Sequence, residues 1–383
     1  MTIVSVGPAP PWRGGIAHYH YGLVQELRAQ AVDVEVLTFA RLYPRLLFPG
    51  TSAADRAEGA FPPLGEAILR PLASWSWRRG ARWIRQRRPE AVLFHWWHPF
   101  FALAYLGVLK RIGGDAPVGF ICHNVASHEG MPLGGRLTEK VLRQGDFFIA
   151  GGEEMAEQIR HLNRRGLVEV VLHPQYDLPY TQQPPPPEEA RRRLGLDREG
   201  PVFLFFGLVR EYKGLDVLLD ALSMLPPRAP WTCVVAGEFY QSRKPYEARI
   251  AELGLGERIR LEDRYIPNSE VPLYFAAADL TVLPYRHATQ SGVAALSFAF
   301  HRPVLTTRVG ALPEMIAEGE NGWLVPPGDP QALASRMAEV VYDPQTARLP
   351  VVEGSSGLPG WQELARTVRR LASAAATEYT HYD

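Results

Sequence analysis

Arg210 and Lys213, two cations with two residues between them, lie in the segment of this chain whose residue types most clearly suggest a chemical role. The apolar run 202–206 precedes them, and residues 215–222 follow with apolar side chains at helical spacing, so the sequence predicts a strand, a loop with two glycines and a helix. Such a loop lets the backbone approach a phosphate, while a guanidinium grips the oxygens as a planar fork and an ammonium adds a point charge. An ordinary strand–loop–helix turn with solvated cations is the alternative for this segment alone.

A second polar loop, which contains His123, His128 and Glu129, follows another predicted strand. A histidine at the carboxyl end of a strand can donate a hydrogen bond to a sugar hydroxyl or to a reacting carbonyl-like centre. A metal site would require a third ligand, and His95 and His98 in a neighbouring loop are the candidates. Direct contact with a substrate is the preferred interpretation, and a polar loop without function is the remaining alternative.

Two further segments are weaker candidates. Gly14 and Gly15 end a loop, residues 7–16, that is too long and too rich in proline for the G-x-G-x-x-G pattern of nicotinamide cofactor sites. Glycines at a helix start let backbone N–H groups face an oxygen-rich ligand, or they serve only a sharp turn. Glu314 stands in the first turn of a later predicted helix, where a carboxylate is favoured for capping alone.

The loop 284–292 is another candidate anion site. Thr289, Gln290 and Ser291 supply capping and donor groups, and a helix is predicted to begin near Gly292. Since the N-terminus of a helix carries partial positive charge, we interpret this loop as a seat for a pyrophosphate that faces the two cations described above. A simple helix cap is compatible with that role.

The elements that must position these loops alternate between strand and helix along the whole chain. Strands are expected at 3–6, 34–38, 91–95, 118–122, 147–150 and 169–172, and again at 202–206, 232–236, 259–261, 280–283, 304–306 and 322–325. Helices are expected between them, including 16–30, 65–87 and 361–375. This α/β alternation predicts two domains with parallel sheets, 1–181 and 182–357, separated at the proline run 184–187, and a last helix in 358–383. Ligands of such sheets bind at the carboxyl ends of the strands.

Composition agrees with two domains of ordinary size in a chain of 383 residues. The hydrophobic fraction of 46% and charged fraction of 21% are typical of a soluble globular protein, and the net charge of zero gives no support for a nucleic-acid partner. Cys122 and Cys233 lie in apolar runs, which favours buried thiols and a reducing compartment. With no predicted signal peptide and no apolar run of about 20 residues, we expect a cytoplasmic protein.

Taken in order along the chain, these loops resemble those of the retaining glycosyltransferases of family 4, which have the GT-B fold of two Rossmann-like domains facing a central cleft. The resemblance covers nearly the whole chain and rests on the segments 14–16, 207–214, 303–307, 310–314 and 321–328. It implies that the first domain binds the acceptor and the second binds a nucleotide sugar. It also implies that the C-terminal helix crosses back to the first domain.

The resemblance further implies roles for single residues. Arg210 and Lys213 would hold the nucleotide diphosphate, and His123 would contact the donor sugar near the reacting carbon. The chain departs from the family at two positions that usually carry glutamate, where it has Thr289 and Ser297. The first glutamate usually meets the transferred sugar and the second the ribose, and a serine accepts a weaker hydrogen bond than a carboxylate. Because Ala-Thr-Gln-Ser-Gly is a pattern of a divergent branch, we interpret this as a variant site.

The implied reaction moves a hexose from a nucleotide diphosphate sugar to a glycan or lipid-linked acceptor, with retention at the anomeric carbon, as in polysaccharide biosynthesis. Arg210, Lys213 and the helix start near Gly292 would neutralise the charge of the leaving group, so no cofactor and no metal are expected. One alternative is a catalytically inactive nucleotide-sugar-binding protein on the same scaffold, which the missing glutamates favour. Another is a nucleotide-sugar epimerase, which usually lacks the Arg-x-x-Lys-Gly arrangement.

The segment 70–88 suggests a further partner because it combines many arginines with tryptophans. These residues are Arg70, Arg78, Arg79, Arg82, Arg85, Arg87 and Arg88, with Trp75, Trp77 and Trp83. A basic helix that carries tryptophans can lie on an anionic membrane and approach a lipid-linked acceptor, which would place the protein peripherally at the inner membrane face. The alternative is a solvated helix that its tryptophans pack onto the first domain.

Overall fold

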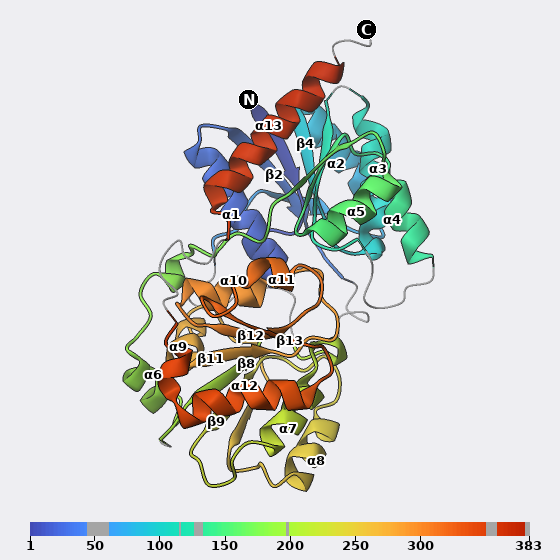
Figure 1. Ribbon diagram of the computed structural model, residues 1–383. Helices are drawn as coiled ribbons and strands as arrows, with labels where there is room; N and C mark the ends of the chain where they lie inside the picture. Colours follow the sequence, from blue (N-terminus) through green and yellow to red (C-terminus); the bar gives the residue numbers. More distant parts are fainter. Residues whose placement is uncertain (44–60, 115, 126–132, 197–198, 350–357, 380–383) are drawn as a thin grey trace. The chain divides into compact units, whose positions relative to one another are not determined.

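The computed structural model describes residues 1–43, 61–114, 116–125, 133–196, 199–349 and 358–379 (Figure 1). These residues divide into two compact units. Unit 1 contains the described residues from Met1 to Pro174 and from Pro359 onward, and unit 2 contains those from Gln175 to Leu358.

Unit 1 is built on a parallel sheet, whose seven described strands run in the order β3-β2-β1-β4-β5-β6-β7. The strands are β1 (Thr2–Val6), β2 (Asp33–Phe39), β3 (Glu66–Leu69), β4 (Ala91–Trp96), β5 (Val118–Cys122), β6 (Phe147–Ala150) and β7 (Leu167–Val170). The helices are α1 (Gly15–Ala29), α2 (Ser74–Arg87), α3 (Ala102–Ile112), α4 (Gly134–Leu142), α5 (Glu153–Leu162) and α13 (Trp361–Tyr379), with a short 3-10 turn, η1 (Pro99–Phe101). Every residue of the central strand β4 is buried, as expected for a parallel strand covered on both faces.

Unit 2 repeats the plan with six described strands in the order β10-β9-β8-β11-β12-β13. The strands are β8 (Val202–Phe206), β9 (Thr232–Ala236), β10 (Ile259–Glu262), β11 (Leu280–Leu283), β12 (Val304–Thr307) and β13 (Gly322–Val325). The helices are α6 (Pro187–Arg193), α7 (Leu215–Ser223), α8 (Lys244–Glu252), α9 (Val271–Ala277), α10 (Gly292–Ala299), α11 (Leu312–Met315) and α12 (Pro330–Tyr342). Three 3-10 turns, η2 (Pro179–Thr181), η3 (Glu211–Lys213) and η4 (Pro344–Ala347), complete it.

The predicted α/β class with two parallel sheets is confirmed, whereas the single helix predicted for 65–87 is wrong. The structure has β3 and then α2 in this segment. Ile68 and Leu69 are buried beside β2, because Gly65 turns the chain with a φ of +80° directly against Val36. A Cβ on Gly65 would lie 2.4 Å from the carbonyl oxygen of Val36, so only glycine fits there.

The C-terminal helix α13 packs on α1 within unit 1, as Figure 1 shows by the red helix beside the blue one. Its first residue, Trp361, is buried, and its ring lies so close to Gly22 that a Cβ there would come within 2.8 Å. Gln30, the C-cap residue of α1, donates a hydrogen bond to the carbonyl oxygen of Gln362 at 3.2 Å. The last helix therefore covers α1, although more than 300 residues of sequence separate the two.

The strand orders identify where each sheet can hold a ligand. The order reverses between β1 and β4 in unit 1 and between β8 and β11 in unit 2. At such a reversal the loops after the two strands leave in opposite directions and leave a crevice beside the carboxyl ends. The loops that follow these strands are therefore the candidate ligand-binding segments.

Candidate functional site

The two loops at the reversal point of unit 2 touch each other. Gly214, with a φ of +69°, ends η3 and begins α7 after β8. A Cβ at this position would lie 2.1 Å from the carbonyl oxygen of Pro284, which follows β11. The glycine therefore serves two needs at once, a left-handed backbone and a close approach between the loops.

Lys213 is the central side chain of this arrangement. It is only 8% exposed, its Nζ lies 5.7 Å from the centre of the Tyr285 ring, and Gly207 leaves the space beside it. Burial, and to a lesser degree the nearby charge of Arg210, lowers the pKa of Lys213 to about 7. Within the described parts of the chain no carboxylate lies within ion-pair distance of this ammonium. Unit 2 thus holds a buried cation whose charge the described protein groups do not neutralise.

Arg210 lies at the start of the same turn and is fixed by an aromatic ring. Its guanidinium carbon lies 3.9 Å from the centre of the Tyr240 ring, a cation–π contact, and the backbone N–H of Tyr240 donates to the carbonyl oxygen of Val209. The two loops after β8 and β9 are joined there. The ring therefore restricts where the guanidinium can reach, so the two cations Arg210 and Lys213 come from one stiff turn.

The helix α10 begins beside this turn. Ser291 is its N-cap, and the Ser291 hydroxyl accepts a hydrogen bond from the backbone N–H of Ala294 at 3.2 Å. A second hydrogen bond joins Ser291 to Tyr285, whose pKa burial raises. Val293, in the first turn of α10, would lie 3.5 Å from a Cβ on Gly207. The positive end of this helix therefore lies next to the turn that carries the two cations.

Thr289 and Gln290 lie half-buried in the loop before α10 and Gly292 is the first residue of the helix. The carbonyl oxygen of Thr289 accepts from the N–H of Ala311, so this loop rests on the loop after β12. Glu314 lies in the first turn of α11, exposed to solvent. The structure thus places all of these predicted residues at the same end of the sheet, in the loops after β11 and β12.

Ser297 lies in a different environment. It has no exposed surface, and its hydroxyl lies 2.7 Å from that of Thr281 and 3.1 Å from the carbonyl oxygen of Arg302. The side chain therefore ties α10 to β11 inside unit 2. The ribose contact predicted for this position is not available to Ser297 in this structure, because its hydroxyl serves the interior.

In unit 1, Gly14 and Gly15 lie at the start of α1, after β1. Gly14 has a φ of +106°, and a Cβ there would meet no atom within 4 Å. The backbone of this helix start is therefore open, and the glycine is required by its conformation rather than by crowding.

His123 directly follows β5 and is buried. Its Nε2 lies 3.1 Å from Nδ1 of His95 in the neighbouring strand β4. Burial, and to a lesser degree the nearby His173 and His20, lowers the pKa of His123 to about 3, so the imidazole is neutral near pH 7. Either nitrogen of such a ring pair can donate, depending on the tautomer. The predicted residues His128 and Glu129 lie outside the described residues.

The structure also reveals a histidine cluster that the sequence did not single out. His20 and His173 join His95 and His123, and the ring of Tyr19 contacts three of the four edge-on. Burial lowers the pKa of each histidine in the cluster. His20 and His173 could not be found by pattern, because each stands alone in its own segment.

The structure provides no support for the metal alternative in the residues it describes. His98 caps η1, where its Nδ1 accepts from the N–H of Phe100, and no group of three His, Cys, Asp or Glu side chains suited to a metal occurs among the described residues. Among the described residues the four imidazoles and the ring of Tyr19 form a buried polar cluster.

Comparison with known proteins assigns both units. Residues 13–174 match the model of "Glycosyltransferase Family 4", and residues 200–343 match that of "Glycosyl transferases group 1". A D-inositol 3-phosphate glycosyltransferase of Xylanimonas cellulosilytica is 30% identical over 303 residues, which cover 76% of this chain and 68% of that protein.

Two solved structures share the fold over almost the whole chain. Sucrose-phosphate synthase from Thermosynechococcus elongatus is 19% identical, with a TM-score of 0.74 and coverage of 98% of this chain and 99% of the other. HepE of Anabaena, in complex with UDP-glucose, is 18% identical, with a TM-score of 0.69 and coverage of 99% of each chain.

Proposed function

The chain belongs to the glycosyltransferases and has their GT-B fold, and on this premise we propose that it transfers a sugar, with retention at the anomeric carbon, from a nucleotide diphosphate sugar to a glycan or lipid-linked acceptor. Unit 2 would bind the donor and unit 1 the acceptor. The reaction needs no cofactor in this proposal, and the nucleotide sugar is a substrate.

The observation that carries the proposal is the buried ammonium of Lys213. A cation that is 8% exposed and has no carboxylate within ion-pair distance in the described chain is costly unless a ligand supplies the anion. Arg210 and the start of α10 place two further positive groups beside it. A diphosphate, with its charge spread over several oxygens, matches three positive groups better than a single carboxylate does.

These groups also suit the chemistry of transfer. As the bond between the sugar and the diphosphate breaks, negative charge grows on the leaving oxygen, and Arg210, Lys213 and the N–H groups of α10 stabilise it there. No metal ion is called for in this account. Thr289 and Gln290 are proposed to contact the donor, together with Gly292, and Glu314 to lie at the edge of the same site.

His123 is proposed to contact the donor sugar, and the backbone at Gly14 and Gly15 is proposed to contact an oxygen-rich group of a substrate. Because the pKa of His123 is lowered to about 3, the ring offers a neutral hydrogen-bond donor or acceptor to a hydroxyl rather than a charge. A neutral contact orients the sugar without repelling the positive charge that develops at its anomeric carbon.

The test is transfer from a panel of donors by the full chain and by Arg210→Ala. The donors include UDP-glucose, which is bound in the HepE structure. The acceptors are glycans and lipid-linked sugars, with inositol phosphate added because a relative carries that name. We expect product with retained anomeric configuration by proton NMR for the wild type and at least a tenfold loss for Arg210→Ala. Nucleotide affinity without turnover would instead establish an inactive binding protein, and conversion of the donor alone would establish an epimerase.

We propose a second role for α2, contact with an anionic membrane surface, which would place the protein at the inner face of a membrane in the cytoplasm. Arginines line its exposed face, and Trp75 and Leu72 beside it are 53% and 64% exposed. The exposed arginines are Arg78, Arg79, Arg82, Arg85 and Arg88, and none has an ion-pair partner in the described chain. No described helix is long and apolar enough to span a bilayer. The contact that we propose is peripheral, with the basic face of α2 on the surface of the membrane.

Cosedimentation with vesicles tests this contact. The full chain is expected to bind vesicles that contain phosphatidylglycerol and not pure phosphatidylcholine, and Arg78→Glu with Arg82→Glu is expected to abolish binding. Arg228→Glu, on an exposed turn of unit 2, is the matched control. Equal binding by the double variant and the control would rule out α2 as the contact.

A further inference from the structure

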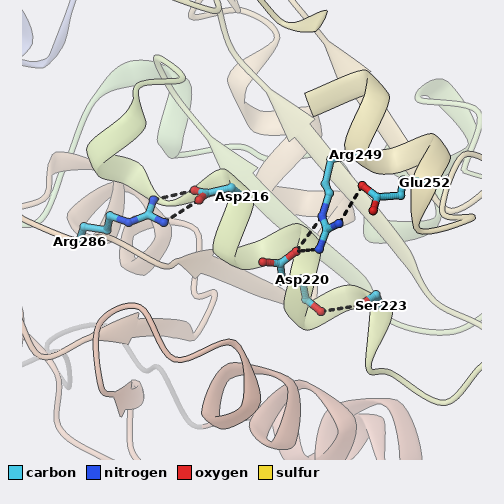
Figure 2. Close-up of polar contacts among 6 residues, drawn as sticks. All are labelled: Asp216, Asp220, Ser223, Arg249, Glu252 and Arg286. Carbon is cyan, nitrogen blue, oxygen red and sulfur yellow. Dashed lines mark hydrogen bonds and ion pairs between the residues drawn. The ribbon is translucent and has the colours of Figure 1, made fainter. Parts of the chain in front are cut away.

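A bidentate ion pair joins the two loops of the proposed diphosphate site. Nη1 and Nη2 of Arg286 donate to Oδ1 and Oδ2 of Asp216 at 2.7 and 2.6 Å (Figure 2). Arg286 belongs to the loop after β11, and Asp216 lies in the first turn of α7, three residues after Lys213. The pair therefore links a residue on each side of the reversal point of the sheet.

The backbone of Arg286 strengthens the same link. Its N–H donates to the carbonyl oxygen of Tyr212 at 2.7 Å, and its Nη1 lies 3.4 Å from the carbonyl oxygen of Glu211. Both carbonyls belong to η3, the turn whose last residue is Lys213. One arginine thus holds the turn that carries the cation and the helix that follows the turn.

We infer that Arg286 and Asp216 are a positioning pair for the diphosphate. The inference rests on the proposed function. The fork fixes the spacing between the turn of Lys213 and the loop that leads into α10, so the ammonium and the helix start converge on one anion. Neither residue touches the anion in this account, because both outer nitrogens of Arg286 are already engaged by Asp216.

This ion pair contributes little to the stability of the fold. The side chains of Arg286 and Asp216 are 34% and 49% exposed, and ion pairs that exposed contribute little to folding. A bidentate contact between a guanidinium and a carboxylate, in contrast, fixes both the distance between the two side chains and their relative orientation. The expected consequence of its loss is therefore a misplaced loop rather than an unfolded domain.

The same helix supplies a matched control. Asp220, four residues after Asp216, accepts from Nε and Nη2 of Arg249 at 3.0 and 2.7 Å, and Arg249 also pairs with Glu252 (Figure 2). The Arg249 and Asp220 side chains are 39% and 36% exposed, similar to the first pair. This second pair joins α7 to α8 and touches neither loop of the site.

The experiment compares nucleoside diphosphate affinity across the two pairs in the full chain. A thermal-shift panel of UDP, GDP, ADP and dTDP first identifies the tightest ligand, and calorimetry then gives its dissociation constant and that of inorganic pyrophosphate. We expect Asp216→Asn and Arg286→Gln each to weaken binding by about tenfold, and the double variant to be no weaker than either. Arg286→Lys, which keeps the charge without the fork, is expected to stay weak.

Asp220→Asn and Arg249→Gln are expected to leave both dissociation constants unchanged while shifting the melting temperature as much as the first pair does. Equal loss of affinity in both pairs, additive losses at Asp216 and Arg286, or unchanged affinity in their variants would overturn the inference. A wild-type chain that binds none of the nucleotides would overturn the proposed function itself, which separates the two failures.

Discussion

At the scale of single residues, the proposed diphosphate site rests on Lys213. The sequence places it correctly after a strand and beside Arg210, since glycine, cation and helical spacing all lie within one short segment. Its burial and the absence of a carboxylate partner in the described chain could not be predicted, because they depend on Tyr285 and Gly207. Those tertiary contacts are what support the proposal of an anion site at this loop.

Proton uptake on binding follows from the pKa of Lys213, which lies at about 7 in the unliganded chain. At pH 8 the amine is mostly neutral, and a bound diphosphate raises its pKa and recharges it, so each ligand brings in close to one proton. The terminal phosphate, with a second pKa of about 6, is already ionised there. Affinity should therefore fall as the pH rises from 7 to 9.

Calorimetry at pH 8 in two buffers of different ionisation enthalpy measures this uptake. Lys213→Arg, whose guanidinium stays charged, should bind without taking up a proton. Identical proton uptake in the wild type and in this variant would mean that another group titrates.

Tyr240 is expected to orient Arg210 by its ring alone. Tyr240→Leu removes the aromatic face at 3.9 Å and should weaken nucleotide binding several-fold, because the guanidinium then samples more rotamers. Tyr240→Phe keeps the face and should bind like the wild type. A loss in Tyr240→Phe as large as in Tyr240→Leu would show that the hydroxyl, and not the ring, matters.

At the scale of elements, the sequence predicted buried strands correctly but assigned residues 65–87 wrongly. The run Val202–Phe206 has every residue buried, and it was predicted as a strand. Residues 65–87 were predicted as one helix, whereas the structure has β3 and then α2 in this segment. Only the contact of Gly65 with Val36 reveals that β3 interrupts it.

The sequence also did not predict which side chains of different elements contact each other. Arg286 and Asp216 are 70 residues apart in the sequence, and no sequence pattern around either residue predicts that the two form an ion pair. Ser297 was predicted from an alignment on Gly292, which fixes its place along α10 but not the neighbour, Thr281, that its hydroxyl meets.

The histidine cluster makes unit 1 sensitive to acid through the elements it joins. His20 of α1 and His173 after β7 have pKa values lowered to about 4 by burial, whereas in the unfolded chain both take up protons below about pH 6.5. Unfolding therefore takes up protons between these values, and stability is lost as the pH falls through this window. Each histidine contributes about 1 kcal/mol or more to this loss.

Scanning calorimetry at pH 7.5, 6.5 and 5.5 measures the effect. His173→Asn, whose amide can still donate to the carbonyl oxygen of Pro174, should reduce the drop in melting temperature on acidification. His287→Asn, at an exposed position of unit 2, is the control and should leave the drop unchanged. An equal drop in wild type and His173→Asn would show that the cluster does not govern acid stability.

At the scale of the whole molecule, the alternation of apolar runs and helical segments predicted two domains with parallel sheets, and the resemblance of the loops to those of the family 4 glycosyltransferases predicted the family. The reversal of strand order in each sheet was not predicted. The zero net charge concealed a local excess, since the exposed arginines of α2 are balanced by acids elsewhere. Composition averages over the chain, whereas binding to a membrane or to a diphosphate depends on where the charges are placed.

The central claim is that a nucleoside diphosphate binds unit 2 at the ammonium of Lys213, and titration of the full chain and of Lys213→Met with the tightest nucleotide tests it most directly. Met fills nearly the same volume without the charge, so the unliganded melting temperature should stay equal or rise, because a desolvated charge is removed. Nucleotide affinity should fall at least tenfold at pH 7. If Lys213→Met binds the nucleotide as tightly as the wild type, the diphosphate does not bind at Lys213 and the account is contradicted.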